Sequence, residues 1–337
     1  MISSTPAAVS STKETNDTSL KDELWFTVMK YMLFGTAFII SVAGNSLVTY
    51  IIFTRIRMKT VTNLFILNLA IGDLVYTFSS PFDIAIQEKG KKWIYLPFFC
   101  KILSPLQTIS MSSSLLTLMA LSLTRYKAIV HPLERQMQEN TAKLSIVLIW
   151  AFSATTVLPQ ILHQQVIDGK CEERWDSQNT RKAYTALLFG FQYVIPLTVM
   201  TTAYGRIGYE LHRPTPASNS LIQEERGKEA NKVVSMLITV TATFAICTLP
   251  TSVMWLWLDF GDADSSYSHF WDVLDILYIF DFINLAAHPI LFVYFSKKFR
   301  SEMRATFLRP GIPTETNANI HRINNKYTLS GTTSTQV

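Results

Sequence analysis

Charged residues are scarce in this chain. Of its 337 residues, only 16% are Asp, Glu, Lys or Arg, whereas 48% are hydrophobic. The apolar residues are gathered into seven long blocks. Each block is long enough to cross the hydrocarbon layer of a bilayer, which is roughly 30 Å thick. The scarcity of charge therefore excludes an ordinary soluble domain and predicts a polytopic membrane protein.

Patterns typical of enzymes and transporters are also missing. The six histidines are scattered without metal-ligand spacing, and no nucleotide-binding loop or nucleophile motif occurs. The internal repeats and matched broken helices of many transporters and channels are lacking. The net charge of +5 is concentrated in the loops assigned below to the cytoplasm. This placement indicates contact with inner-leaflet lipid and argues against a nucleic-acid partner.

Seven helices are expected, because lipid offers backbone amides no hydrogen-bonding partner. The apolar windows are Trp25–Phe53, Val61–Gln87, Pro97–Val130, Ala142–His163, Arg181–Leu211, Lys228–Leu258 and His269–Phe295. The predicted fold is an all-α membrane bundle of seven transmembrane helices at residues 25–308, flanked by an N-terminal tail at 1–24 and a disordered C-terminal tail at 309–337.

Loop charges predict the orientation of this bundle. The Thr54–Thr60 connection carries three basic residues and no acid, whereas Asp259–Asp275 carries five acids and no Lys or Arg. By the positive-inside rule the first loop faces the cytoplasm. The N-terminal tail is then extracellular, the C-terminal tail is cytoplasmic, and Asn16 begins a glycosylation sequon on the outer side.

The chain has only three cysteines. Cys100 lies at the outer end of the third span and Cys171 in the outer loop between the fourth and fifth spans. An oxidising compartment favours a disulfide between two such residues, whereas Cys247 lies deep in the sixth span. We predict a Cys100–Cys171 disulfide, with two unrelated free thiols as the alternative.

The predicted spans carry one landmark after another in chain order. The landmarks are Gly44-Asn45, Leu67-Asn68-Leu69-Ala70-Ile71-Gly72-Asp73, Trp93 with Cys100, Arg125-Tyr126, Trp150, Pro196 with Tyr204, Phe244 with Cys247-Thr248-Leu249-Pro250, and Pro289. From Trp25 to Leu308 the chain thus resembles the rhodopsin-like (class A) G-protein-coupled receptors. The resemblance implies a plasma-membrane receptor that signals through heterotrimeric G proteins and is not an enzyme.

A polar cluster is expected in the middle of the bundle. Asn284 and His288 lie one helical turn apart, and they are expected to converge with Asp73 and Ser114. The resemblance implies an allosteric sodium ion here, which would be the protein's only cofactor; a hydrogen-bonded network with water is the alternative. A proton on His288 would compete with sodium for Asp73, unless His288 is a neutral core histidine.

Four positions depart from the family pattern. Thr124 replaces the usual acid before Arg125, His288 the Asn before the seventh-helix proline, Phe292 the Tyr after it, and Thr248 the aromatic residue before the sixth-helix proline. The predicted G-protein-coupling residues are Thr124, Arg125, Tyr126 and Tyr204. A threonine cannot hold Arg125 by charge, so a non-coupling or constitutively biased receptor is the alternative function.

The outer half of the bundle predicts the class of ligand. Gln107 replaces the Asp of amine receptors, and Trp271–Phe295 lacks the Lys of opsins. Gln107 with Asp259 is similar to peptide receptors of the neuropeptide Y and RFamide group, and acids at the rim attract cations. The predicted ligand-binding residues are Gln107, Met111, Gln192, Trp255, Asp259, Tyr278 and Asp281.

The expected ligand is therefore a small cationic neuropeptide, with a non-peptide small molecule as the alternative. A solvated acidic loop is the alternative for Asp259, and an internal hydrogen bond is the alternative for Asp281.

The cytoplasmic side is expected to bind further partners. Ser296–Leu308 has apolar and basic residues on opposite faces, which predicts a short amphipathic eighth helix on the inner leaflet. The Ser and Thr residues between Thr328 and Thr335 suit phosphorylation before arrestin binding. The terminal Thr335-Gln336-Val337 fits strand addition to a PDZ domain.

Overall fold

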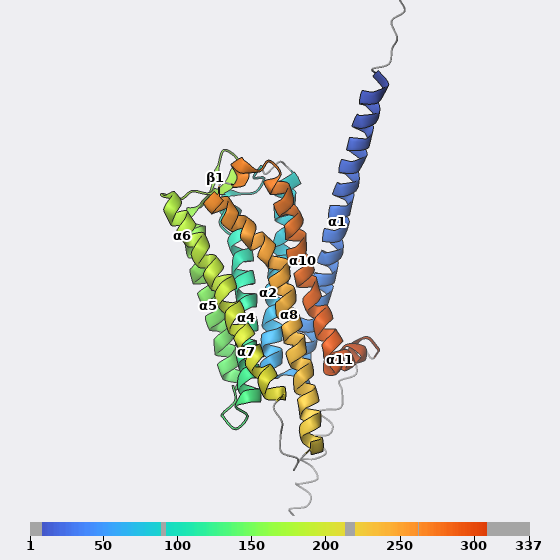
Figure 1. Cartoon of the computed structure of the whole chain (residues 1–337), viewed down its shortest axis with the longest axis vertical. Helices are drawn as coiled ribbons and strands as arrows, with labels where there is room; N and C mark the ends of the chain where they lie inside the picture. The colour runs from blue at the N-terminus through green and yellow to red at the C-terminus, as the bar shows by residue number, and fades with distance from the viewer. Residues whose placement is uncertain (1–8, 89–91, 213–219, 262, 309–337) are drawn as a thin grey trace, which may run out of the picture. The chain divides into compact units, whose positions relative to one another are not determined.

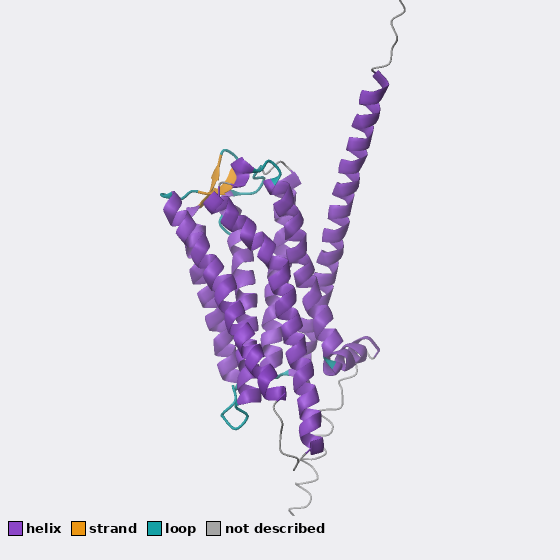
Figure 2. Ribbon diagram, viewed as in Figure 1, coloured by secondary structure: helices purple, strands orange, loops and turns teal. Residues whose placement is uncertain are grey.

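The structure is a computed structural model of the whole chain, and it describes residues 9–88, 92–212, 220–261 and 263–308. Helices dominate this described part, and a single two-stranded hairpin interrupts them (Figures 1 and 2). The longer helices are α1 (Val9–Thr54), α2 (Val61–Glu88), α4 (Leu103–Val130), α5 (Glu139–His163), α6 (Gln178–Phe189), α7 (Ile195–His212), α8 (Ser220–Gly261), α10 (Phe270–Phe295) and α11 (Lys297–Leu308). The short elements are η1 (Ile56–Met58), α3 (Pro97–Cys100), β1 (Gln164–Ile167), β2 (Lys170–Glu173), η2 (Gly190–Val194) and α9 (Ala263–Ser266).

Within the described residues, seven segments are long and apolar enough to cross a membrane. They are Trp25–Thr54, Val61–Ile86, Pro97–Val130, Glu139–His163, Gln178–His212, Ala230–Gly261 and Phe270–Phe295. Each lies within a few residues of a predicted span, so the seven-helix prediction is confirmed. The chain is a multi-pass membrane protein.

The helix α1 begins before the first predicted span. It starts at Val9, so most of the expected tail at 1–24 is helical. Residues 9–24 contain neither proline nor glycine, and nothing in their backbone chemistry stops the helix from extending past the apolar window. Asn16 lies in this part of α1, where the structure describes the backbone and not the side chains. The predicted C-terminal tail at 309–337 lies outside the described residues.

The helices differ in how deeply they lie in the bundle. The helix α2 packs against α1 and α4, α4 also packs against α5 and α7, and α10 packs against α1 and α8. In the second span 56% of the apolar window is buried, against 17% in the fourth and fifth. The fourth and fifth spans therefore leave most of their apolar surface for lipid, whereas the second forms the centre of the bundle.

Two glycines lie where neighbouring helices approach each other closely. A Cβ built on Gly44 of α1 would lie 2.5 Å from Cγ of Pro289 on α10, and one built on Gly72 of α2 would lie 2.8 Å from Oγ of Ser114 on α4. A real Cβ has no room at either distance. Two of the landmark positions are thus explained by close packing.

Buried polar side chains link the inner helices. The Asn45 amide donates to the backbone carbonyl of Leu285 on α10 at 3.2 Å. The Asn68 amide donates to Thr117 on α4 at 2.7 Å, while its carbonyl accepts from the Trp150 indole on α5 at 2.8 Å. Asn68 therefore joins three helices, which explains why a polar residue is tolerated in the apolar interior.

The helix α11 follows α10 and belongs to a second compact unit that starts at Lys298. The predicted eighth helix is confirmed as a helix. Its position on the inner leaflet remains a prediction.

Candidate functional site

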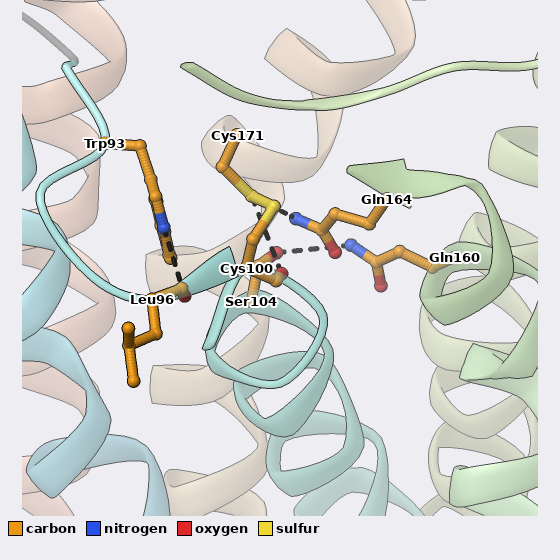
Figure 3. Close-up of a disulfide and its surroundings, with 7 residues drawn as sticks. All are labelled: Trp93, Leu96, Cys100, Ser104, Gln160, Gln164 and Cys171. Atoms are coloured by element: carbon orange, nitrogen blue, oxygen red, sulfur yellow. Dashed lines mark hydrogen bonds between the residues drawn. A yellow bond between two sulfur atoms is a disulfide. The ribbon is translucent and has the colours of Figure 1, made fainter. Parts of the chain in front are cut away.

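A disulfide ties the outer loop to the third span. Cys100 and Cys171 are bonded, with their Cα atoms 5.7 Å apart, so the predicted pair is confirmed (Figure 3). Cys171 lies on β2, which pairs with β1 through a tight turn at Asp168-Gly169, where both residues have positive φ. Such a turn matches the twist of a two-residue hairpin. The disulfide therefore holds the hairpin at the end of the bundle where the third span begins.

The hairpin is also held by polar contacts around the disulfide. The Gln164 amide donates to Sγ of Cys171 at 3.4 Å, and the Gln160 amide donates to the Ser104 hydroxyl at 3.2 Å (Figure 3). The backbone N–H of Trp93 donates to the carbonyl of Gly169 at 2.6 Å. The loop before the third span thus contacts the hairpin turn directly.

Gln107 contacts an acid that the sequence analysis did not identify. Its side-chain amide donates to Oδ2 of Asp83, which lies near the outer end of α2. Asp83 lies within an apolar span, and that setting was the available signal, because an ionisable residue in such a span marks a functional site by default. A carboxylate of α2 therefore adjoins the predicted ligand-binding glutamine.

Asp259 is buried and already has partners. Only 3% of the residue is exposed. Nε of Arg181 lies 2.7 Å from its Oδ1, and the Thr185 hydroxyl donates to its Oδ2. Both partners lie on α6, and neither was singled out by sequence. The structure does not join Asp259 to Gln107, and the solvated-loop alternative for Asp259 is wrong because the side chain is enclosed.

The aromatic residues predicted for the site occur together. The Trp255 side chain lies beside the Tyr278 hydroxyl, and Tyr278 packs against the apolar cluster between α8 and α10. Gln192 lies in the π-helical turn η2. Its amide nitrogen is buried and has no partner within the described part of the chain. Trp255 and Tyr278 therefore form one side of the predicted ligand site. The side-chain amide of Gln192 is a hydrogen-bond donor without a partner among the described residues.

Asp281 lines a cavity deeper in the bundle. The cavity is also lined by Met111, Asp73, Ser114 and Asn284. Only 6% of Asp281 is exposed, and its Oδ1 has no hydrogen-bond partner among the described residues. The hydroxyl of Thr251 lies beside this carboxyl and interacts with it. The alternative for Asp281, an internal hydrogen bond, therefore stays open through Thr251.

The predicted mid-membrane cluster converges. Nδ1 of His288 lies 2.8 Å from Oδ2 of Asp73, and both side chains are fully buried. Asp73 Oδ1 and Asn284 Oδ1 have no partner within the described residues. With the Ser114 hydroxyl these atoms provide three oxygen ligands around one cavity. This donor set fits a hard cation such as sodium, although His288 holds the second oxygen of Asp73.

Among the described residues, the arginine at the inner end of the third span forms no salt bridge with an acid. The Thr124 hydroxyl donates to the carbonyl of Ala120 at 2.7 Å and does not contact Arg125. Nε of Arg125 is buried with no partner in the described segments. The Tyr126 hydroxyl lies 3.5 Å from Nε2 of His131. The Tyr204 hydroxyl lies 3.3 Å from the Thr241 hydroxyl on α8. In the described segments, Tyr204 is the one predicted coupling residue whose side chain is seen to contact another span.

Comparison with known proteins agrees with this architecture. The family model described as 7 transmembrane receptor (rhodopsin family) matches residues 44–292. Rat neuropeptide FF receptor 1 is 31% identical over 80% of this chain and 68% of its own length. The RYamide receptor of Drosophila melanogaster is 31% identical over 84% of this chain and 64% of its own length. Human neuropeptide FF receptor 1 is 29% identical over 83% and 70%, respectively.

The matched region contains the disulfide, the converging polar cluster, the second to sixth spans in full, and parts of the first and seventh spans. Because the model match covers far more than half of the chain, and the family consists of receptors and not of enzymes, the chain belongs to the rhodopsin family of seven-transmembrane receptors.

Proposed function

We propose that this chain is a cell-surface receptor for a small cationic peptide with an amidated end, and that it signals through heterotrimeric G proteins. Relatives that are named as receptors for neuropeptide FF and for RYamide support a peptide ligand. In this proposal the N-terminus is extracellular, the Asn16 sequon is glycosylated, and the ligand enters beside the disulfide-bonded hairpin.

One observation carries the choice of a cationic ligand. Asp83, Asp259 and Asp281 come from three different helices and are partly or fully buried in the half of the bundle that holds the disulfide. Buried carboxylates are costly without cations or donors. The guanidinium group of an arginine side chain meets this need with charge and with paired N–H donors. A neutral Gln107 beside Asp83 suits a peptide amide, since it both donates and accepts.

The proposal is tested by ligand-stimulated nucleotide exchange. Membranes containing the receptor are screened with an amidated-peptide library across a panel of G proteins. We expect stimulation by arginine-containing peptides and loss of potency when arginine is replaced by citrulline, which is neutral and nearly isosteric. Charge reversal by Asp259→Arg should reduce the potency of the arginine peptides. A receptor that responds only to uncharged compounds contradicts the proposal.

A second function, a receptor that is constitutively biased or does not couple, is favoured by the inner end of the third span. The Thr124 hydroxyl bonds to its own helix, and within the described part of the chain Nε of Arg125 has no hydrogen-bond partner. The arginine then lacks a restraint that would favour one state of the bundle. The basal exchange rate separates this function from ligand-dependent coupling.

We also propose that the mid-membrane cavity binds sodium through Asp73, Ser114 and Asn284. The unpartnered oxygens of Asp73 and Asn284 support this assignment. A proton on His288 would neutralise Asp73 and weaken sodium binding, so sodium and acid should act on basal exchange in opposition. The variant His288→Asn should keep the sodium effect and lose its dependence on pH. Unchanged pH dependence in that variant contradicts the assignment.

Arrestin and a PDZ domain are proposed as partners of the C-terminal tail. The phosphorylation cluster between Thr328 and Thr335 and the terminal Val337 support this proposal. Both lie outside the described residues. A pull-down in which a tail lacking Val337 binds a PDZ domain equally well would remove the PDZ partner.

A further inference from the structure

Both carboxylate oxygens of Asp259 are contacted by side chains from one face of α6. Arg181 approaches Oδ1 and Thr185 donates to Oδ2, and these two residues are one helical turn apart. The neighbouring Lys182 lies over the ring of Phe260, with its Nζ 5.8 Å from the ring centroid. The outer turn of α6 is thus fastened to the outer turn of α8.

The contact with Arg181 is an incomplete one. Its Nε lies 2.7 Å from Oδ1, which is an ion-pair distance. Yet Oδ1 accepts no aligned hydrogen bond from any described residue. The charge of Asp259 is therefore neutralised while the directional part of a guanidinium–carboxylate contact is not made. A guanidinium approaching along the lone pairs with two N–H groups would bind this oxygen pair more strongly.

We infer that Arg181 occupies the position at Asp259 that the arginine of the ligand takes on binding, so that the ligand's guanidinium replaces that of Arg181. The contact of Asp259 with Arg181 and Thr185 is called the latch below. The inference rests on the proposed peptide receptor and identifies the residue against which the ligand must compete. Removing Arg181 alone would leave a carboxylate that is 3% exposed without a countercharge, and this state is strongly disfavoured. The latch therefore opens by exchange with an incoming cation.

The exchange acts on the contact between the fifth and sixth spans. Two further ties follow along these spans: the Tyr193 hydroxyl donates to the carbonyl of Ala245 at 2.8 Å, and Tyr204 adjoins Thr241 at 3.3 Å. Tyr193 itself lies in the π-helical turn η2, which directly follows α6. Loss of the latch releases α6 from α8, whereas the Tyr193–Ala245 and Tyr204–Thr241 contacts remain in place. The ligand thereby changes the packing of α6 against α8.

The first experiment separates competition from simple structural support. Binding of a peptide ending in Arg-Phe-amide, and of its citrulline twin, is measured on the full-length receptor and on Arg181→Gln. We expect the variant to bind the arginine peptide about tenfold more tightly, a change of roughly 1.4 kcal/mol, and the citrulline twin with unchanged affinity. Arg174→Gln, which neutralises an exposed arginine before α6 and outside this contact, should change neither affinity. An equal loss for both peptides in Arg181→Gln overturns the inference.

A second measurement needs no ligand. The unfolding temperatures of the parent, Arg181→Gln, Asp259→Asn and the double variant form a double-mutant cycle. If Arg181 and Asp259 interact, the double variant loses less unfolding temperature than the two single variants lose together. Strict additivity overturns the inference even where peptides bind. If the parent binds neither peptide, the proposed function fails, and the cycle still decides whether Arg181 neutralises Asp259.

Discussion

The three acids of the outer half meet three different chemical environments. Asp83 accepts from a neutral amide, Asp259 faces a guanidinium and a hydroxyl, and Asp281 has an oxygen without any partner among the described residues. A ligand cation gains most where a carboxylate is least satisfied. The identity of each neighbour, and not the acid itself, therefore ranks these positions as binding sites.

Among these three acids, Asp281 has the least satisfied carboxylate. Its replacement should therefore have the largest effect on peptide potency. Replacing it with Asn keeps its size and removes the charge that a peptide cation would contact. We expect Asp281→Asn to lower the potency of an arginine-containing peptide about tenfold or more. Potency is measured by nucleotide exchange. Asp272→Asn, on the same helix with an exposed side chain, is the control, and an equal effect of both variants would contradict the prediction.

Gly44 should be intolerant of any side chain. A methyl group there would overlap the ring of Pro289, and such overpacking costs about 1–3 kcal/mol. We expect Gly44→Ala to lower the unfolding temperature in detergent. Gly35→Ala on the same helix has open space around its Cβ and should be neutral or stabilising, by up to about 1 kcal/mol. Equal unfolding temperatures for the two variants would show that α1 and α10 are not in close contact.

Among the secondary-structure elements, the outer hairpin depends most on contacts with the rest of the chain. Its two strands of four residues each cannot form a stable sheet alone. The disulfide to α3 and the Trp93–Gly169 hydrogen bond supply the missing support. The hairpin is therefore an attached element, and the bundle beneath it has its own packing.

Breaking the disulfide should loosen this element first. The bond joins residues 71 positions apart, and removing a crosslink of that span costs about 2–5 kcal/mol. We expect Cys100→Ser to lower the unfolding temperature and to raise hydrogen exchange in β1 and β2. Protected hairpin amides in the variant would show that the polar contacts suffice. Cys247→Ser, which removes the free thiol of the sixth span, is the control.

Across the whole bundle, the balance between signalling states depends on weak contacts at the inner end. Arg125 has no acid beside it in the sequence, and Phe292 cannot donate a hydroxyl hydrogen bond. Both losses affect the equilibrium between two packings of the same helices. Small changes in energy at this end should therefore alter basal activity.

Restoring the acid tests this balance. In Thr124→Asp a carboxylate lies beside Arg125, and a pair of this kind contributes up to about 1 kcal/mol. We expect basal nucleotide exchange to fall by about two- to fivefold. Thr124→Asn has the same size without the charge and should keep the parental rate. A higher basal rate in Thr124→Asp would mean that Arg125 is restrained by other groups.

The seven spans were predictable from the sequence because lipid acts on each apolar run separately. Trp25–Thr54 or Phe270–Phe295 must be helical wherever the other helices lie, since its amides have no other partner. The Cys100–Cys171 bond was predictable for a similar reason, because both cysteines follow the side of the membrane on which their segments emerge. The start of α1 at Val9 was missed, because the apolar window does not limit a helix in water.

Side-chain partnerships could not be predicted in the same way. Gln107 and Asp83, Arg181 and Asp259, and His288 and Asp73 are distant in sequence and meet only after the helices have packed. Which pairs meet depends on the rotation and depth of each helix, and these are fixed by contacts such as that of Gly44 with Pro289. The chain alone determines which segments enter the membrane, because partitioning is local. Packing decides which acids remain open to a ligand, because a carboxylate's neighbours come from other helices.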